Sequence, residues 1–167
     1  MPRLRKGGPH PLKSDDAPPY VGALLRLCWQ RARDHMHEAV RDAGFTDIQE
    51  AHFAAFSYPL PEGVRPSDFA RQIRMSRQAA NYLIGQMEEL GYLERRAGPE
   101  NGRRLIYHTK RGWDVVETIY GALHELQKQW ASEVGQERFR DFMAVLRTLV
   151  AHEPNPPARR QSSPEVR

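Results

Sequence analysis

Apolar residues recur every three or four positions over long stretches of the chain, a pattern typical of amphipathic helices. The longest stripe predicts a helix over residues 20–43, with Gly44 as its C-cap. Two further stripes predict helices over 110–131 and 135–152. These three segments carry more apolar surface than the short elements between them can cover.

A shorter stripe predicts a small helix around residues 51–56, with Thr46 or Asp47 as its N-cap. The proline-rich segment 59–63 then interrupts the chain.

Residues 66–91 have the pattern of a helix-turn-helix. A short amphipathic helix over 67–74 leads into a tight turn at Met75, and Ser76 is a favourable N-cap for a helix that ends near Leu90. Its predicted inward face is apolar, formed by Ala80, Leu83, Ile84 and Met87.

The hydrophobic period changes at residue 92. Segments 92–96 and 103–109 favour two strands, joined by a turn rich in glycine and proline at 97–102. The predicted fold is therefore mainly α with a small β-hairpin (α+β): a helix-turn-helix, a hairpin wing over 92–109, and long flanking helices.

With 167 residues, the chain has the length of one domain. We expect this domain over residues 19–152, between a basic arm at 1–18 and a tail at 153–167 that are too polar and proline-rich to fold. The formal net charge of +4 favours a polyanionic partner without proving one.

Cys28 is the only cysteine, which excludes an intrachain disulfide and fits a reducing compartment. Its place on an apolar stripe predicts a buried structural thiol, with redox sensing as the alternative. The chain shows no membrane span and no secretory signal, so we expect a cytoplasmic protein. Histidine spacing predicts no metal site, and no cofactor is expected.

The polar side of the segment that starts at Ser76 is the candidate for reading DNA. An α-helix fits the major groove, where arginine recognises guanine and asparagine or glutamine recognises adenine. The predicted contacts are Ser76, Arg77, Gln78, Asn81 and Tyr82. The alternative is that these residues form an ordinary solvated face.

Four arginines flank the turn of the hairpin: Arg95, Arg96, Arg103 and Arg104. A cationic ribbon beside a recognition helix suits phosphate contacts or entry into the minor groove. The alternative is an edge hairpin kept soluble by its charges. The same basic surface is extended by Arg71, Arg74, Lys110 and Arg111.

The run from Ser67 to Arg95 resembles the DNA-binding core of the MarR family, and Gly102 to Gly112 resembles its second wing strand and the start of the next helix. The likeness covers roughly residues 20–150. It implies a homodimer whose long helices intertwine. The family wing carries an aspartate and an arginine where this chain has Glu100 and Gly102, so the resemblance assigns the arginine's role to Arg103 or Arg104.

Dimerisation also follows from the apolar stripes, which a monomer would expose at Leu24, Phe142, Leu146 and Leu149. The alternative is that they fold onto their own subunit. A two-fold dimer predicts a near-palindromic operator.

The family resemblance further implies a small-molecule effector. Aromatic side chains that would line its pocket are Trp29, Phe53, Phe56, Tyr58 and Trp113, with plain core packing as the alternative.

The sequence thus predicts a sequence-specific regulator of transcription that binds double-stranded DNA, a repressor responsive to a small molecule. One alternative is a winged-helix module that binds proteins and no DNA. An enzyme is the other, and the chain shows no nucleophile elbow or phosphate-cradling loop that would support it.

Overall fold

The computed structural model describes residues 19–98 and 102–151. The arm at 1–18 and the tail at 153–167, both expected to be disordered, lie outside the described residues, and so does Glu100.

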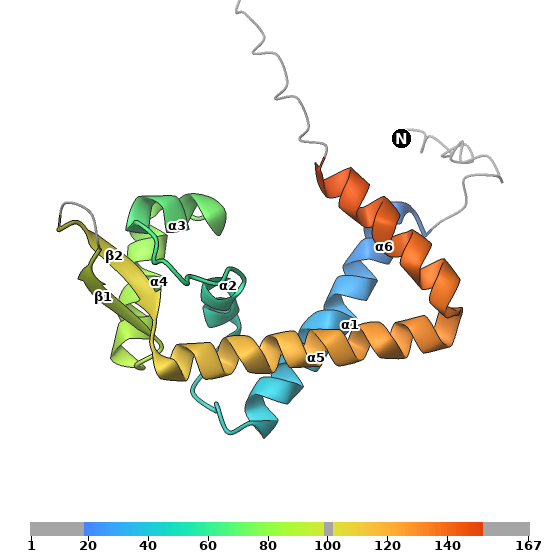
Figure 1. The fold of residues 1–167 in the computed structure, drawn as a ribbon, viewed down its shortest axis with the longest axis horizontal. Helices are drawn as coiled ribbons and strands as arrows, with labels where there is room; N and C mark the ends of the chain where they lie inside the picture. The colour runs from blue at the N-terminus through green and yellow to red at the C-terminus, as the bar shows by residue number, and fades with distance from the viewer. Residues whose placement is uncertain (1–18, 99–101, 152–167) are drawn as a thin grey trace, which may run out of the picture. The chain divides into compact units, whose positions relative to one another are not determined.

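The chain divides into two compact units, residues 1–126 and 127–167. The described elements of the first unit are α1 (Val21–Asp42), η2 (Glu50–His52), α2 (Phe53–Phe56), α3 (Pro66–Gln72), α4 (Arg77–Glu89), β1 (Leu93–Ala97), β2 (Arg104–His108) and the first part of α5 (Lys110–Val134). In Figure 1, α3 and α4 lie against each other, and the hairpin flanks α4. The predicted class, mainly helical with one small antiparallel hairpin, is confirmed.

The short helix after α1 differs from the prediction in its start and in its cap. It begins as the 3₁₀ turn η2, with Gln49 as N-cap, and the Gln49 backbone N–H donates to Nδ1 of His52 at 3.2 Å. The prediction of Thr46 or Asp47 as cap was wrong. The Asp47 carboxylate instead accepts hydrogen bonds from Tyr92 and Arg111, far along the chain.

The hairpin pairs β1 with β2 in antiparallel register, from Leu93 opposite His108 to Ala97 opposite Arg104. A third segment joins the free edge of β2. Val64 forms a bridge with Ile106, and the two residues exchange backbone hydrogen bonds of 3.0 and 2.8 Å. The wing is therefore fixed to the chain that leads directly into α3.

The core of the first unit forms where α1, α2, α3, α4, the hairpin and α5 contribute their apolar sides. Its most buried large side chains are Tyr92, Phe56, Phe69, Ile84, Met87, Leu93, Ile106, Val40, Val115 and Val116. Phe56 and Tyr92 pack edge to face, with ring centres 5.7 Å apart. This core fixes the orientation of α4.

The second unit contains the end of α5 and α6 (Gln136–Ala151). Between the two helices stands Gly135, whose φ of +93° suits a glycine. None of the α6 residues is buried, and Phe142, Val145, Leu149 and Val150 are all at least 40% exposed. The described residues thus leave the apolar face of α6 exposed.

Candidate nucleic-acid interface

The start of α4 follows from one hydroxyl group. The Ser76 Oγ accepts a hydrogen bond from the backbone N–H of Ala79 at 3.1 Å, which satisfies a donor that has no partner inside the helix. The helix accordingly begins at Arg77, as the sequence predicts.

The two faces of α4 are sharply divided. The apolar side chains Ala80, Leu83, Ile84 and Met87 are at most 4% exposed. The residues predicted to contact DNA are all exposed on the other side: Ser76, Arg77, Gln78, Asn81 and Tyr82. The Tyr82 side chain is 70% exposed, which is unusual for a large aromatic residue, and its hydroxyl accepts a hydrogen bond from Gln86 Nε2 at 3.4 Å. The buried face holds the helix, and the exposed face is free to enter a groove.

The turn between α3 and α4 is closed by a left-handed residue. Arg74 has φ 54°, a conformation that costs a non-glycine residue about 1–2 kcal/mol. The backbone N–H of Met75 donates to the carbonyl of Ala70 at 3.0 Å, which ends α3 tightly. This turn brings the exposed side chain of Arg74 next to the beginning of α4.

Arg95, which the sequence suggested as a DNA contact, is engaged within the protein. Its guanidinium lies 3.0 Å from the carboxylate of Glu88, and the two side chains are 30% and 26% exposed. Because Glu88 lies on α4 and Arg95 on β1, this ion pair ties the wing to the helix.

Arg96 points to the opposite face of the hairpin. Its guanidinium lies 3.9 Å above the ring of Tyr107, a cation–π contact, and 3.6 Å from Glu94. The side chain remains 59% exposed, so the contact does not remove it from solvent.

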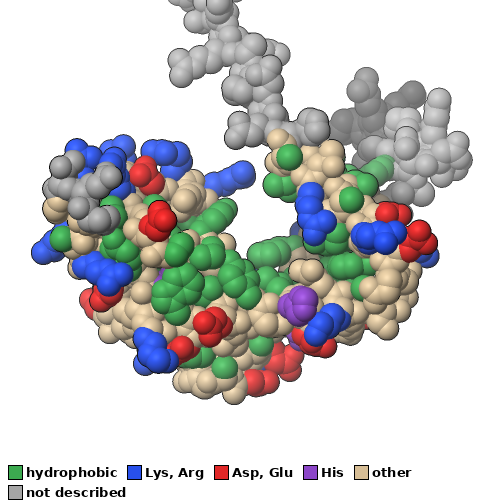
Figure 2. All heavy atoms as spheres, viewed as in Figure 1, with side chains coloured by type: hydrophobic (Ala, Val, Ile, Leu, Met, Phe, Trp, Pro, Cys, Tyr) green, Lys and Arg blue, Asp and Glu red, His purple; other side chains and the backbone are tan. Residues whose placement is uncertain are grey.

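Arg103 and Arg104 are exposed and form no ion pair with any residue in 19–98 or 102–151. Figure 2 shows Lys and Arg side chains gathered around the hairpin and α3. Of the four wing arginines, these two are the ones that have neither an ion pair nor a ring contact among the described residues.

A polar cluster that the sequence did not reveal joins three distant segments. The Tyr92 hydroxyl donates to Asp47 and accepts from Arg111 at 2.9 Å, and Arg111 also donates to Asp47 at 2.8 Å. Burial raises the pKa of Asp47, but the hydrogen bond from Tyr92 and the charge of Arg111 outweigh it and hold that pKa below its ordinary value. Since Tyr92 follows α4 directly, the cluster fixes the end of that helix.

A cavity of about 450 Å³ opens beside α1, η2, α2 and α5. Trp29, Phe53 and Phe56 line it, as the sequence suggested, whereas Tyr58 and Trp113 do not. The Trp113 ring packs instead against His108, at 5.2 Å between centres. The remaining lining residues are Arg33, Met36, His37, Glu50, Ala54, Ser57, Ile119, Tyr120 and Leu123.

Comparison with known families identifies the segment that carries this geometry. The model of the MarR family matches residues 47–104, which span η2 to the wing. This segment is therefore similar to the MarR family. The match covers the helix-turn-helix and most of the hairpin, where the sequence resemblance lay.

Solved structures extend the likeness of fold to the flanking helices. The transcriptional regulator PA4135 aligns with a TM-score of 0.61 at 16% identity, covering 82% of this chain and 100% of its own. MepR of S. aureus bound to ethidium bromide aligns at 0.57 and 16% identity, covering 79% and 95%. The regulator Tm0710 of Thermotoga maritima aligns at 0.55 and 20% identity, covering 78% and 91%. A comparison with curated proteins returned no match.

One expectation outside the matched segment is contradicted by the structure. Cys28 was expected to be buried, and it is exposed in this chain, because the α1 stripe on which it lies has too few partners here. Among the described residues, no three acidic, histidine or cysteine side chains form a cluster suited to a metal ion. Over the same residues, no helix combines the length and hydropathy needed to span a membrane.

Proposed function

We propose that this protein is a sequence-specific regulator of transcription that binds double-stranded DNA through α4 and the wing. The observation that carries the proposal is the division of α4 into a buried apolar face and an exposed polar face that starts at a capped N-terminus. In a helix-turn-helix, the N-terminal residues of the second helix reach the base edges. Arg77, Gln78 and Asn81 are suited to that role, and a MepR variant solved with an oligodeoxyribonucleotide has the same fold, at a TM-score of 0.53.

The proposed active form is a homodimer. On α1, the side chains of Leu24, Leu25, Leu27 and Trp29 are between 45% and 58% exposed. The apolar face of α6 is equally uncovered. Burying such faces against a second copy is favourable by about 25 cal/mol per Å² of apolar surface, and two-fold symmetry then calls for a near-palindromic operator.

A small apolar effector is proposed to bind in the 450 Å³ cavity and to relieve repression. Its walls are mainly aromatic and aliphatic, with the Arg33–Glu50 ion pair of 2.6 Å as its main charged feature. Ligand sites are commonly apolar cavities of this size with few polar groups. MepR, which shares the fold, has been solved with ethidium bromide.

The test is a gel-shift series on operator fragments selected from genomic DNA. Arg77→Ala or Gln78→Ala is expected to relax discrimination at particular base pairs, by about 1–3 kcal/mol each. Arg103→Ala combined with Arg104→Ala is expected to weaken binding to all sequences alike. If none of these variants differs from the unsubstituted protein, the interface is wrongly assigned.

The alternative function is a winged-helix module that binds an acidic protein. Arg103 and Arg104 are compatible with it, but the exposed Gln78, Asn81 and Tyr82 provide groups that read bases rather than balance carboxylates. Capture of an acidic protein by nuclease-treated material, together with absence of operator binding, would favour this alternative.

A further inference from the structure

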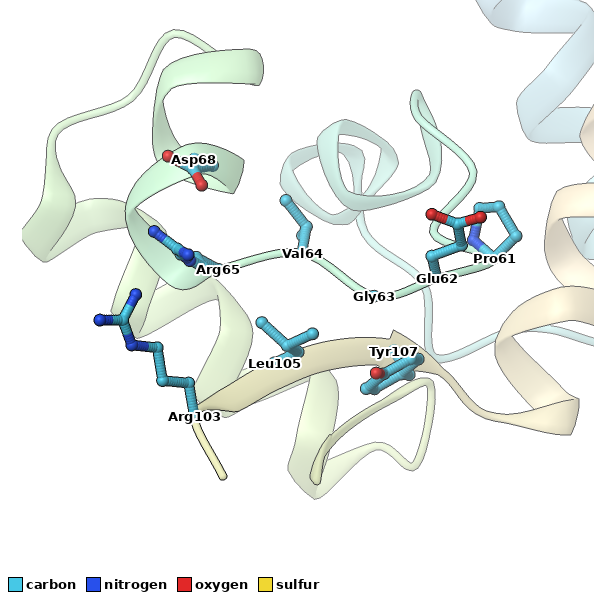
Figure 3. A pocket seen from close by; sticks show the side chains of 9 residues that line it. All are labelled: Pro61, Glu62, Gly63, Val64, Arg65, Asp68, Arg103, Leu105 and Tyr107. Atoms are coloured by element: carbon cyan, nitrogen blue, oxygen red, sulfur yellow. The ribbon is translucent and has the colours of Figure 1, made fainter. Parts of the chain in front are cut away.

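A groove of about 930 Å³ runs along the outer face of the wing. One wall is the segment from Pro61 to Arg65, continued by Asp68 of α3. The other is β2 and the residue before it, through Arg103, Leu105 and Tyr107 (Figure 3). Arg103 is one of the DNA contacts predicted from the sequence, whereas none of the residues of the opposite wall was predicted.

The backbone pairing holds the two walls in register. Because Val64 pairs with Ile106, its neighbours Gly63 and Arg65 lie opposite Tyr107 and Leu105. Alternate residues of a strand share a face, so Arg103 lies on this face too. Arg65 and Arg103 are thus diagonal neighbours, whose Cβ atoms are typically about 7–8 Å apart.

Gly63 shows how closely the walls approach. A Cβ at this position would lie 2.4 Å from the Tyr107 ring, and its φ of +74° also favours glycine. Arg96 contacts the same ring at 3.9 Å. Tyr107 is only 6% exposed. Because Gly63 packs this closely on the Tyr107 ring, the segment that carries Arg65 is held firmly against β2.

The charges of the groove are separated along its length. Figure 3 shows Arg65 and Arg103 at one end and Glu62 beside Pro61 at the other. Asp68 accepts a hydrogen bond from Arg71 at 3.0 Å, so its charge is already offset. Neither Arg65 nor Arg103 has an ion pair among the described residues, and both are exposed. This end of the groove therefore carries two exposed positive charges.

We propose that Arg65 and Arg103 together bind one phosphate of the DNA backbone that lies beside the outer face of the wing. This inference rests on the proposed function. The first helix of a helix-turn-helix crosses the backbone, and Arg65 immediately precedes α3. Arginine offers two parallel N–H donors to a phosphate, and two converging guanidinium groups fix its position without reading sequence. By holding this phosphate, Arg65 sets how deeply α4 enters the major groove of the DNA.

The test compares Arg65→Ala, Arg103→Ala and the double variant on an operator and on unrelated DNA, with Arg41→Ala as a matched control. Arg41 is an exposed arginine at the end of α1, so its loss changes net charge equally. Arg65→Ala is expected to weaken binding to both DNAs by about tenfold or more. The slope of log affinity against log salt is expected to fall by about 2 for a dimer. The double variant is expected to lose little more affinity than the single variant that binds DNA more weakly, because both side chains hold the same phosphate.

The outcomes separate this inference from the proposed function. If the unsubstituted protein binds no DNA, both fall. If it binds DNA and Arg65→Ala matches Arg41→Ala in affinity and salt slope, only the inference falls. Strict additivity of the two single variants contradicts a shared phosphate. If Arg65→Ala abolishes binding of inorganic phosphate yet leaves DNA binding as in the control, the groove serves a small anion and the proposal is refuted.

Discussion

Replacing Gly112 by alanine tests how α5 is seated against the end of α4. A Cβ at Gly112 would lie 2.1 Å from the carbonyl oxygen of Tyr92 and 3.3 Å from the Cβ of His108. Carbon–oxygen contacts are usually no closer than about 3.3 Å, so the first turn of α5 would have to withdraw by about 1 Å. The nearest neighbours are backbone atoms of Tyr92, a buried residue, and they have little freedom to yield.

Two opposing effects set the change in the free energy of unfolding. In an open helix, alanine is more stable than glycine by about 0.5–1 kcal/mol. Here the overlap costs about 1–3 kcal/mol, and withdrawal also weakens the 3.1 Å hydrogen bond from the Thr109 N–H to the Tyr92 carbonyl, worth about 0.5–1.5 kcal/mol. The overlap wins, and we expect Gly112→Ala to lower the free energy of unfolding by about 2 kcal/mol.

Urea unfolding at a fixed protomer concentration measures this difference, because the stability of a dimer depends on concentration. Gly85→Ala is the control, since a Cβ at that α4 position meets nothing within 4 Å and is expected to raise stability by up to about 1 kcal/mol. If Gly112→Ala were as stable as the unsubstituted protein, α5 would not contact Tyr92 as described.

Three further predictions concern polar contacts. Tyr92→Phe keeps the ring but removes the hydrogen bonds to Asp47 and Arg111. Because these partners are partly exposed, we expect the free energy of unfolding measured in urea to fall by about 1–2 kcal/mol. No fall would show that the cluster is dispensable. Burial lowers the pKa of His108 below its ordinary 6.5, so the unfolded chain binds that proton more readily. The melting temperature should therefore fall as pH drops below about 6.5, and it should fall less steeply in His108→Phe. An equal dependence of melting temperature on pH in the two proteins would refute this. Glu88→Gln releases Arg95 and removes a negative charge, so the affinity for non-specific DNA in gel shifts should rise with little change in melting temperature. Unchanged affinity would indicate that Arg95 does not reach the DNA.

The long helices were predictable because a period of 3.6 residues repeats many times in each. The cap at Ser76 was predictable because its hydrogen bond closes within three residues. Cap signals failed at Asp47, whose partners lie 45 and 64 residues away. No local pattern distinguishes an aspartate that caps a helix from one that binds a distant tyrosine.

The Val64 bridge was missed for a related reason. A single paired residue has no alternation of its own, and the prolines around it indicate only a break. The groove wall that contains Arg65 depends on this bridge, so no pattern in the sequence places Arg65 beside Arg103.

The four wing arginines show where sequence reasoning about charge reaches its limit. In the sequence they form one cationic cluster around a turn. Strand alternation places Arg95 and Arg96 on opposite faces of the hairpin. Arg95 faces α4 and contacts Glu88, whereas Arg96 faces outward and contacts Tyr107. Arg103 and Arg104 lack such partners among the described residues and stay exposed. A charge already balanced by a carboxylate releases fewer counterions when DNA approaches. The electrostatic strength of the wing is therefore set by which arginines the fold leaves unpaired rather than by how many the hairpin contains.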